Sequence, residues 1–405
     1  MRAARPLSAG KISVRAKAPL KDDYILSLVY TPGVAEPCRM IAKNPASVYD
    51  YTCKGNFVAI VSDGSAVLGL GNLGPLAALP LLEGKATILK CLAGIDALPI
   101  ALDVASDDEF VMAAANLQPT FGGLLIDDVA APRCFRIEKA LQARTNIPVL
   151  HDDQHGTAIV VLAGLLNSLK AVGKDLQNVR VVVSGTGASG IAVSKLLLHM
   201  GVEELILADE HGLLYEGRTE GMDFAKEEMA FVTNPHRMTG TLAEAIVGAD
   251  VFIGLSVASI VTPEMVSSMA ERAIVFALAN PEPEIAPAAA RAAGAAIVAC
   301  GVFEDLNTMT NVLAFPGLMR GCLDVRATTV TNTMKIAAAK AIASLVSGDQ
   351  LDKGIVLPRP LDLRVPPAVA MAVARSAIVG GVAQLIVNPE DIATRTRQLI
   401  YGDTV

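Results

Sequence analysis

The sequence lacks the features by which proteins bind large anionic partners. It has no run of lysine or arginine and no basic patch interleaved with aromatic residues, which make up only 4% of the chain. Acidic residues outnumber basic ones, 41 to 34, for a formal net charge of −7. Because nucleic acids and anionic membrane surfaces attract clustered positive charge, neither is an expected partner. The composition leaves small ligands, anionic or neutral, as candidate partners.

Cysteine is present but follows no pattern. The six cysteines have no CxxC spacing and form no dense framework; they are Cys38, Cys53, Cys91, Cys134, Cys300 and Cys322. We interpret them as reduced core residues of a protein in a reducing compartment.

No apolar run is expected to cross a membrane. Asn167 and Lys170 interrupt the run after Thr157, and Arg375 with paired glycines interrupts the one after Pro366. The N-terminal segment is basic but has no apolar stretch, so a secretory signal is not expected. We therefore expect a cytoplasmic protein; a cleaved organelle-targeting segment is the alternative.

The chain has enough apolar residues, 52% of 405, for two or three well-packed domains. Short apolar runs alternate with Ala- and Leu-rich stretches such as 109–117 and 134–144, an alternation typical of parallel α/β folds. The expected strands are 57–61, 98–102, 122–126, 147–150, 179–183, 205–207, 250–253, 273–277 and 296–299. After about residue 323 the chain is Ala-rich and expected to be helical, apart from a proline-rich loop at 357–367.

Two glycine groups fit the pattern GxGxxG. The first, Gly69, Gly71 and Gly74, ends in Pro75 and has no matching acid at a strand end, so we expect a tight loop that approaches substrate or cofactor. The second follows a strand and opens a helix, as a dinucleotide site requires. Its expected cofactor-binding turn is Gly185, Thr186, Gly187, Ala188, Ser189 and Gly190. The alternative is a glycine-rich packing turn.

Two further residues are candidates for touching the cofactor. Asp209 ends the next strand, where a carboxylate can accept the ribose hydroxyls and would repel the extra phosphate of NADP. This favours NAD, although His211 and Arg218 follow closely and leave NADP possible. Asn280 lies after another strand, where it can touch the nicotinamide ribose or the substrate; an ordinary Asn-Pro turn is the alternative.

Four acids suggest a metal site. Asp127 and Asp128 end one apolar run, and Asp152 and Asp153 end the next expected strand after one helix. Neighbouring parallel strands would gather these carboxylates on one rim, and all-oxygen ligands suit Mg²⁺ or Mn²⁺ rather than zinc. Helix capping or a solvated loop is the alternative for each pair alone.

Over nearly its whole length the sequence resembles the small-subunit malic enzymes of bacteria and archaea. The matching segments, in order, are YTPGVAEPC (30–38), VSDGSAVLGLGNLGP (61–75), EGKATILK (83–90), AGIDALPI (93–100), IDDVAAPRCFRIE (126–138), HDDQHGTA (151–158), the second glycine turn, FALANPEPEI (276–285), NVLAFPG (311–317) and LDVRAT (323–328). The resemblance implies oxidative decarboxylation of L-malate to pyruvate and carbon dioxide, with a nicotinamide cofactor and a divalent cation.

The resemblance also assigns roles. Lys85 matches the family's general base, which must be neutral to act, and burial near the cation would lower its pKa in that direction. Tyr30 matches the general acid that protonates the enol of pyruvate; an interface or core tyrosine is the alternative. Asp152 matches the residue that positions Lys85. Asp127, Asp128 and Asp153 match the metal ligands, and Asn280 and Asn311 match residues that bind malate or the nicotinamide ribose.

The chain departs from the family in three places. Asp127 replaces the usual glutamate, the turn 256–259 lacks the usual proline and glycine, and the loop 301–311 has Val302 and Thr310 where relatives have arginine and asparagine. The reaction type is therefore better supported than the substrate. An oxaloacetate decarboxylase, a malolactic-type enzyme, an amino-acid dehydrogenase and a catalytically silent NAD-binding paralogue remain alternatives.

We expect an α/β protein with an N-terminal catalytic domain and a Rossmann-type cofactor domain. Residues 1–155 would form the catalytic and metal-binding domain, 156–320 the cofactor domain, and 321–405 a helical segment that packs back on the first domain. The active site would lie in the cleft between them. By analogy with its relatives, the protein is expected to form a homodimer.

Overall fold

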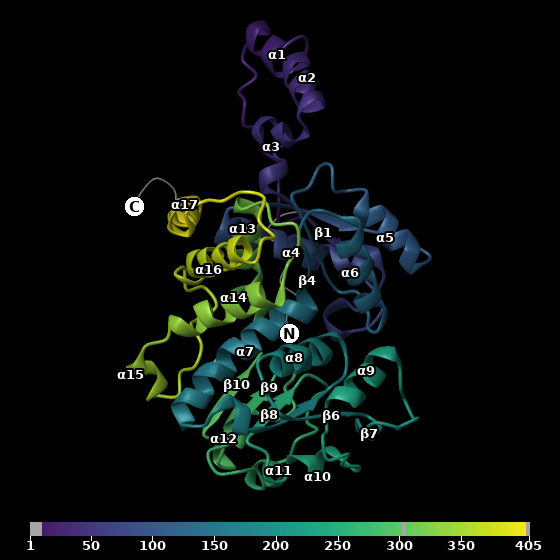
Figure 1. Ribbon diagram of the computed structural model, residues 1–405, viewed down its shortest axis with the longest axis vertical. Coiled ribbons are helices and arrows are strands. Elements are labelled where there is room, and N and C mark those ends of the chain that lie inside the picture. The colour runs from purple at the N-terminus through teal and green to yellow at the C-terminus, as the bar shows by residue number, and fades with distance from the viewer. Residues whose placement is uncertain (1–9, 302–304, 402–405) are drawn as a thin grey trace.

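The computed structural model describes residues 10–301 and 305–401 (Figure 1). Two parallel sheets form its framework, as the alternating pattern predicts. All nine expected strands are present, within three residues of the expected bounds. A tenth strand, β7 (Gly212–Leu213), has only two residues and no sequence signal of its own.

The first sheet has the order β2 (Asp96–Ala101), β1 (Phe57–Ser62), β3 (Gly123–Ile126) and β4 (Val149–His151), all parallel. Alternate residues of β1 face two different cores. Val58 and Ile60 pack with helix α4 (Pro75–Ala93), whereas Ala59 and Val61 pack with α5 (Asp107–Ala115) and α6 (Arg133–Arg144). Coverage of both faces explains why the strand is apolar at successive positions.

Helix α7 (Asp152–Val172) leaves β4 and runs through the middle of the molecule against α8 (Ala188–His199) and α14 (Asn332–Ser344) (Figure 1). Among the described residues, α7 is the one helix that is long enough and apolar enough to cross a membrane. This finding corrects the expectation that no apolar run has the length to do so. Its most apolar window is 72% buried inside the protein. A core helix passes the same test, so the signal is weak evidence for a membrane span.

The second sheet has the order β10 (Ile297–Cys300), β9 (Ile274–Ala277), β8 (Val251–Gly254), β5 (Arg180–Ser184), β6 (Glu204–Asp209) and β7. It is parallel except for β6 with β7. The chain builds outward from β5 in both directions, which creates a topological switch point between β5 and β8, where such folds bind ligands. The remaining helices of this half are α9 (Phe224–Val232), α10 (Leu242–Ile246), α11 (Pro263–Ser267) and α12 (Pro287–Ala292).

The C-terminal helices return to the first sheet. They are α13 (Phe315–Asp324), α14, α15 (Gly348–Leu351), α16 (Val365–Val379) and α17 (Pro389–Tyr401). Of these, α13, α16 and α17 contact α4, and the buried guanidinium of Arg320 donates to Asn56 beside β1. The division of the chain at residues 155 and 320, with a C-terminal segment assigned to the first domain, stays a prediction.

The N-terminal helices α1 (Asp23–Val29), α2 (Ala35–Lys43) and α3 (Val48–Tyr51) form an arm that extends from the body of the protein (Figure 1). Within the described chain, no residue of α1 or α2 is buried. Apolar side chains of the arm are nevertheless numerous among the exposed ones: Leu20, Tyr24, Leu26, Leu28, Val29, Tyr30 and Met40.

Candidate functional site

The acids expected to bind metal lie together. Asp127 and Asp128 follow β3, Asp153 lies in the first turn of α7 directly after β4, and these two strands are parallel neighbours. One carboxylate oxygen from each acid lies within 4.8 Å of the others. Asp128 also has a positive φ of 51°, an unusual conformation for a residue with a side chain, and its N–H donates to Asp153 Oδ2 at 3.0 Å. The backbone is thus shaped around the carboxylates.

Several carboxylate oxygens of this cluster and of the neighbouring Asp152 lack a partner in the described chain. Within the described residues, Asp127 Oδ2, Asp128 Oδ2 and Asp152 Oδ1 are buried without a hydrogen-bond partner. Burial, and then repulsion from Asp153, raises the pKa of Asp128 to about 7. Burial is also the main cause that raises the pKa of Asp127. Unpaired carboxylate oxygens converging in a buried place are the ligand set of a hard divalent cation such as Mg²⁺ or Mn²⁺.

Lys85 extends from α4 into this group of acids. Its Nζ lies 2.6 Å from Asp152 Oδ2 and also donates to Asp127 Oδ1. Burial lowers the pKa of Lys85, but the charges of Asp127, Asp152 and Asp153 together outweigh burial and raise that pKa well above its usual value. Burial thus acts in the expected direction, but the surrounding carboxylates, whose charge a cation would offset, hold the ammonium charged.

Asp152 connects two of the expected residues. Its Oδ2 accepts from Lys85 and, at 2.6 Å, from Asn311 Nδ2. Asn311 begins the short 3₁₀ helix η5 (Asn311–Leu313), which contacts α7. Gly156 lies beneath this contact, since a Cβ there would lie 2.1 Å from Asp152 Oδ1 and 2.8 Å from the Asn311 Cβ. The contact with Lys85 is the expected one, and the catalytic roles of all three residues stay predictions.

The second glycine turn has the geometry of a phosphate site. It joins β5 to α8, whose first N–H groups have no side-chain cap in the described chain. Gly185 has φ 109°, and a Cβ at Gly190 would lie 1.9 Å from the Gly185 carbonyl oxygen. Thr186 and Ala188 lie in the same turn. Ser189 Oγ donates to the carbonyl of Asp153 at 2.7 Å, so the turn adjoins the acid cluster.

Asp209 ends β6 as expected, but its carboxylate is already occupied. Oδ1 accepts from the His211 N–H and Arg218 Nη1, and Oδ2 accepts from Arg218 Nη2 and, at 2.8 Å, from Lys226 Nζ. Burial would raise the pKa of Asp209, yet these donors hold it at about 2. The side chain is 1% exposed. The argument for NAD, which needs a free carboxylate, loses its support here.

Asn280 lies between loops of the two halves. A Cβ at Gly301, after β10, would lie 3.3 Å from Asn280 Oδ1, and a Cβ at Gly69 would lie 3.8 Å from the Asn280 carbonyl oxygen. The first glycine loop therefore lies beside the loop after β9, and its approach to substrate or cofactor stays a prediction. Val302, the expected departure beside it, lies outside the described residues.

Tyr30 is the expected site residue that the chain does not bring to the acids. It caps the C-terminus of α1 on the projecting arm and is 66% exposed, whereas Lys85 is 8% exposed. Sequence reasoning missed two other residues. No sequence pattern marks Lys226 as a partner of Asp209, and none marks Glu284, within the segment 276–285, as fully buried among loops of the cofactor sheet.

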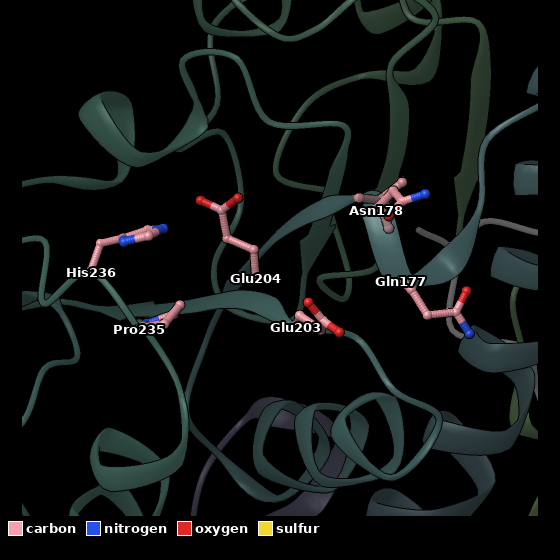
Figure 2. A pocket seen from close by; sticks show the side chains of 7 residues that line it. Gln177, Asn178, Glu203, Glu204, Pro235 and His236 are labelled. Atoms are coloured by element: carbon pink, nitrogen blue, oxygen red, sulfur yellow. The ribbon is translucent and has the colours of Figure 1, made fainter.

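A separate hollow lies at the opposite edge of the second sheet (Figure 2). Figure 2 shows its lining by Gln177, Asn178, Glu203, Glu204, Pro235 and His236. Four of these residues, from Gln177 to Asn178 and from Glu203 to Glu204, precede or begin β5 and β6, and the other two follow α9. The glycine turn and Asp209 instead lie at the carboxyl ends of β5 and β6. This hollow is therefore distinct from the acid cluster.

Comparisons with known proteins agree with this geometry. Residues 9–109 match the family model of the malic enzyme N-terminal domain, and residues 154–378 match that of the malic enzyme NAD binding domain. A bifunctional malic/malolactic enzyme of Bacillus subtilis is 54% identical over 98% of this chain and 97% of its own length. An NAD-dependent malic enzyme of Geobacillus stearothermophilus is 48% identical over 93% of this chain and 78% of its own. Other relatives are named NADP-dependent malic enzymes.

The crystal structure of a malic enzyme from Pyrococcus horikoshii superposes with a TM-score of 0.93 at 44% identity, covering 97% of this chain and 92% of that one.

Proposed function

Because this chain belongs to the malic enzyme family, we propose that it catalyses the oxidative decarboxylation of L-malate to pyruvate and carbon dioxide with reduction of NAD(P). One observation carries the assignment to this site. Lys85 and the carboxylates of Asp127, Asp128 and Asp153 meet beside a dinucleotide turn, joined to it by the bond from Ser189 to Asp153. A 2-hydroxy acid placed there would meet a base, a cation site and a hydride acceptor together.

The residues that would hold a divalent cation are Asp127, Asp128 and Asp153, whose clustered carboxylate oxygens, two of them buried without a partner in the described chain, suit a hard ion. When bound, the cofactor accepts the hydride of malate, and the cation supplies Lewis-acid chemistry while offsetting the negative charge that now raises the pKa of Lys85. Asp153 is the most exposed of the three, with 31% of its side chain accessible, and lies on the side open to a ligand.

Lys85 is the proposed general base for the malate hydroxyl. Its ammonium is held by Asp127 and Asp152, so it is oriented before the substrate arrives. The neighbouring carboxylates favour the ammonium form of Lys85, which cannot accept a proton. Lys85 can therefore act as a base only after the negative charge of these neighbours is offset and the ammonium has lost its proton. Asp152 and Asn311 position Lys85, and Asn280, exposed at the junction of the two halves, is placed to touch the nicotinamide ribose or malate.

The assay for this function is the absorbance of reduced cofactor when purified protein meets L-malate with NAD or NADP. Reduction should require Mg²⁺ or Mn²⁺, should yield pyruvate and should disappear in Lys85→Ala. Lys90→Ala is the matched control, because Lys90 lies on the same helix with 60% of its side chain exposed. Reduction that survives chelator and Lys85→Ala would contradict the proposal.

The cofactor preference is not set by repulsion at Asp209. Because Arg218 and Lys226 neutralise this carboxylate, we propose that the enzyme accepts NADP as well as NAD. The same assay, run with each cofactor over a range of concentrations, measures the ratio of the two values of kcat/KM. A ratio above about 10³ in favour of NAD would contradict a neutralised Asp209.

Tyr30 can serve as the general acid if a second copy of the chain supplies it. The arm that carries it has no buried residue in α1 or α2 and displays apolar side chains to solvent. Exposed apolar patches of this kind mark protein interfaces. We therefore propose a homodimer in which the arm of one protomer covers the other and delivers its Tyr30 to the partner's Lys85.

Mixed dimers test this arrangement. Tyr30→Phe and Lys85→Ala should each be inactive alone, but a mixed dimer has one site with Lys85 from one protomer and Tyr30 from the other. Random exchange makes about half of the dimers mixed, so about a quarter of wild-type activity should return. If Tyr30 acts within its own chain, or the protein is a monomer by light scattering, no activity returns.

A malolactic reaction is the second candidate, because the Bacillus subtilis relative is named a bifunctional malic/malolactic enzyme. In that reaction the cofactor is retained and lactate is the product. Quantifying lactate and pyruvate by chromatography in the same assay separates the two, since free reduced cofactor accumulates only with pyruvate. The boundaries at residues 155 and 320 and a cytoplasmic location are proposed on the sequence argument alone.

A further inference from the structure

Glu284 is a fully buried carboxylate with no assigned role. Its Oε1 accepts from the N–H of Ser256 at 2.9 Å and from Ser256 Oγ at 3.4 Å, and its Oε2 accepts from the N–H of Ala279 at 3.0 Å. A buried carboxylate is costly unless its oxygens are matched by donors. Here the donors come from two different loops, so the side chain joins segments that are otherwise separate.

The joined loops follow adjacent strands at the ligand-binding edge of the second sheet. Ser256 follows β8, and Ala279 follows β9. Ser256 Oγ also lies 3.0 Å from Ser184 Oγ, at the end of β5. One carboxylate therefore links the ends of three neighbouring strands, including the pair β5 and β8 that forms the topological switch point.

The surrounding backbone is shaped to admit this carboxylate. A Cβ at Gly254, the last residue of β8, would lie 2.3 Å from the carboxyl carbon of Glu284. Any side chain there would displace Glu284. The main chain of Glu284 is held as well, because its carbonyl accepts from the Val261 N–H at 3.0 Å.

The link bears directly on Asn280, the residue after Ala279. The Asn280 side chain has a single weak bond within the described chain, 3.5 Å to the Leu278 carbonyl, so its direction depends on the backbone that carries it. That backbone is fixed one residue earlier by Glu284. We propose that Glu284 is a positioning residue, which holds the loops after β8 and β9 together so that Asn280 meets the nicotinamide half of the cofactor. This inference rests on the proposed function.

The primary test is Glu284→Gln, with Glu282→Gln as the matched control, because Glu282 lies two residues away and is exposed. Glutamine retains one acceptor oxygen and turns an NH₂ group toward the other backbone donor. Titration of NADH, followed by its fluorescence, should show binding weakened about tenfold in Glu284→Gln and unchanged in Glu282→Gln. Unchanged NADH binding in Glu284→Gln, even with a lower Tm, would reduce Glu284 to a structural role and overturn the proposal.

A double-mutant cycle with Asn280→Ala tests whether Glu284 acts through Asn280. If it does, Glu284→Gln should weaken NADH binding far less in the Asn280→Ala background than in the wild type. Equal effects in both backgrounds would overturn the proposal. Should Glu284→Gln fail to fold, Ser256→Ala removes one donor and should weaken NADH binding about threefold, and no effect there would count against the link. NADH binding needs no turnover, so these results stand apart from the malate assay.

Discussion

Carboxylates lie at the ends of parallel strands in both sheets of this protein, but those in the first sheet have fewer internal partners than the one in the second sheet has. Asp127, Asp128 and Asp153 gather beside β3 and β4, and in the described chain Asp127 Oδ2 and Asp128 Oδ2 are buried without a hydrogen-bond partner. Asp209 ends β6 with four donors on its two oxygens. The pKa of Asp128 is raised to about 7, chiefly by burial, whereas hydrogen bonds that outweigh burial lower that of Asp209 to about 2.

The contrast shows what a strand-end acid needs in order to bind a ligand. Its position brings it to the edge of the sheet where ligands bind, but a carboxylate whose lone pairs are filled by internal donors has no capacity left for an external ligand. Asp209 is filled by Arg218, nine residues later, and by Lys226, seventeen residues later. Asp209 is thus a structural anchor for the loop after β6, and the three acids of the first sheet form the cation site we propose.

The largest effect that would sharpen this contrast is expected at Asp153. Asp153→Asn should reduce kcat by about 10²- to 10³-fold, because it removes one ligand and one charge from the proposed cation site. The measurement is malate-dependent cofactor reduction at saturating Mn²⁺, together with Mn²⁺ binding by calorimetry. Asp108→Asn is the control, since Asp108 is exposed on α5. Wild-type Mn²⁺ affinity in Asp153→Asn would break the contrast.

Asp209→Asn should instead act on stability. It leaves Arg218 and Lys226 without their counter-charge, with side chains only 4% and 12% exposed, so the free energy of unfolding should fall by about 3 kcal/mol. Urea denaturation measures this change. Asp362→Asn is the matched control, because it removes a pair whose arginine, Arg364, is 61% exposed, and should cost less than about 1 kcal/mol. An equal loss in both variants would show that Asp209 is no special anchor.

Much of this fold was predictable because hydrophobic pattern sets it. Eight of the nine expected strands are fully or largely buried, so their apolar runs identify them, and β2 is mostly half-buried. The glycine turn is required by close backbone contacts at Gly185 and Gly190. The proximity of Asp127 and Asp153 also follows from local sequence, since both end neighbouring parallel strands.

The rest depends on contacts that sequence order does not show. Lys85 contacts Asp152 from 67 positions away, and Asn311 reaches the same acid from 159 positions away, so only the fold reveals how many charges surround the lysine. Donors reach Asp209 from a separate loop and helix. For Tyr30 the motif predicts a role, but not that the residue lies on an arm exposed in the single chain.

The smallest expected effect is a pH dependence of opposite sign at the two sites. The folded pKa of Asp209, about 2, lies below its ordinary value, so its stabilisation is present above about pH 4 and is lost as the pH falls toward 2. The folded pKa of Asp128, about 7, lies above its ordinary value. The unfolded chain therefore releases this proton first, and stability falls as the pH rises from about 4 to 7.

Melting temperatures in chelator across this range measure the effect at Asp128. Asp128→Asn cannot ionise, so its Tm should fall less than that of the wild type between about pH 4 and pH 7, a difference of a few degrees. Adding Mn²⁺ to the wild type near pH 7 should recover the lost stability, because the cation binds the ionised acids of the folded state. Parallel Tm curves for the wild type and Asp128→Asn would mean that the folded protein stabilises the charge of Asp128 as fully as it stabilises that of Asp209. In that case the contrast between the two strand ends would not hold.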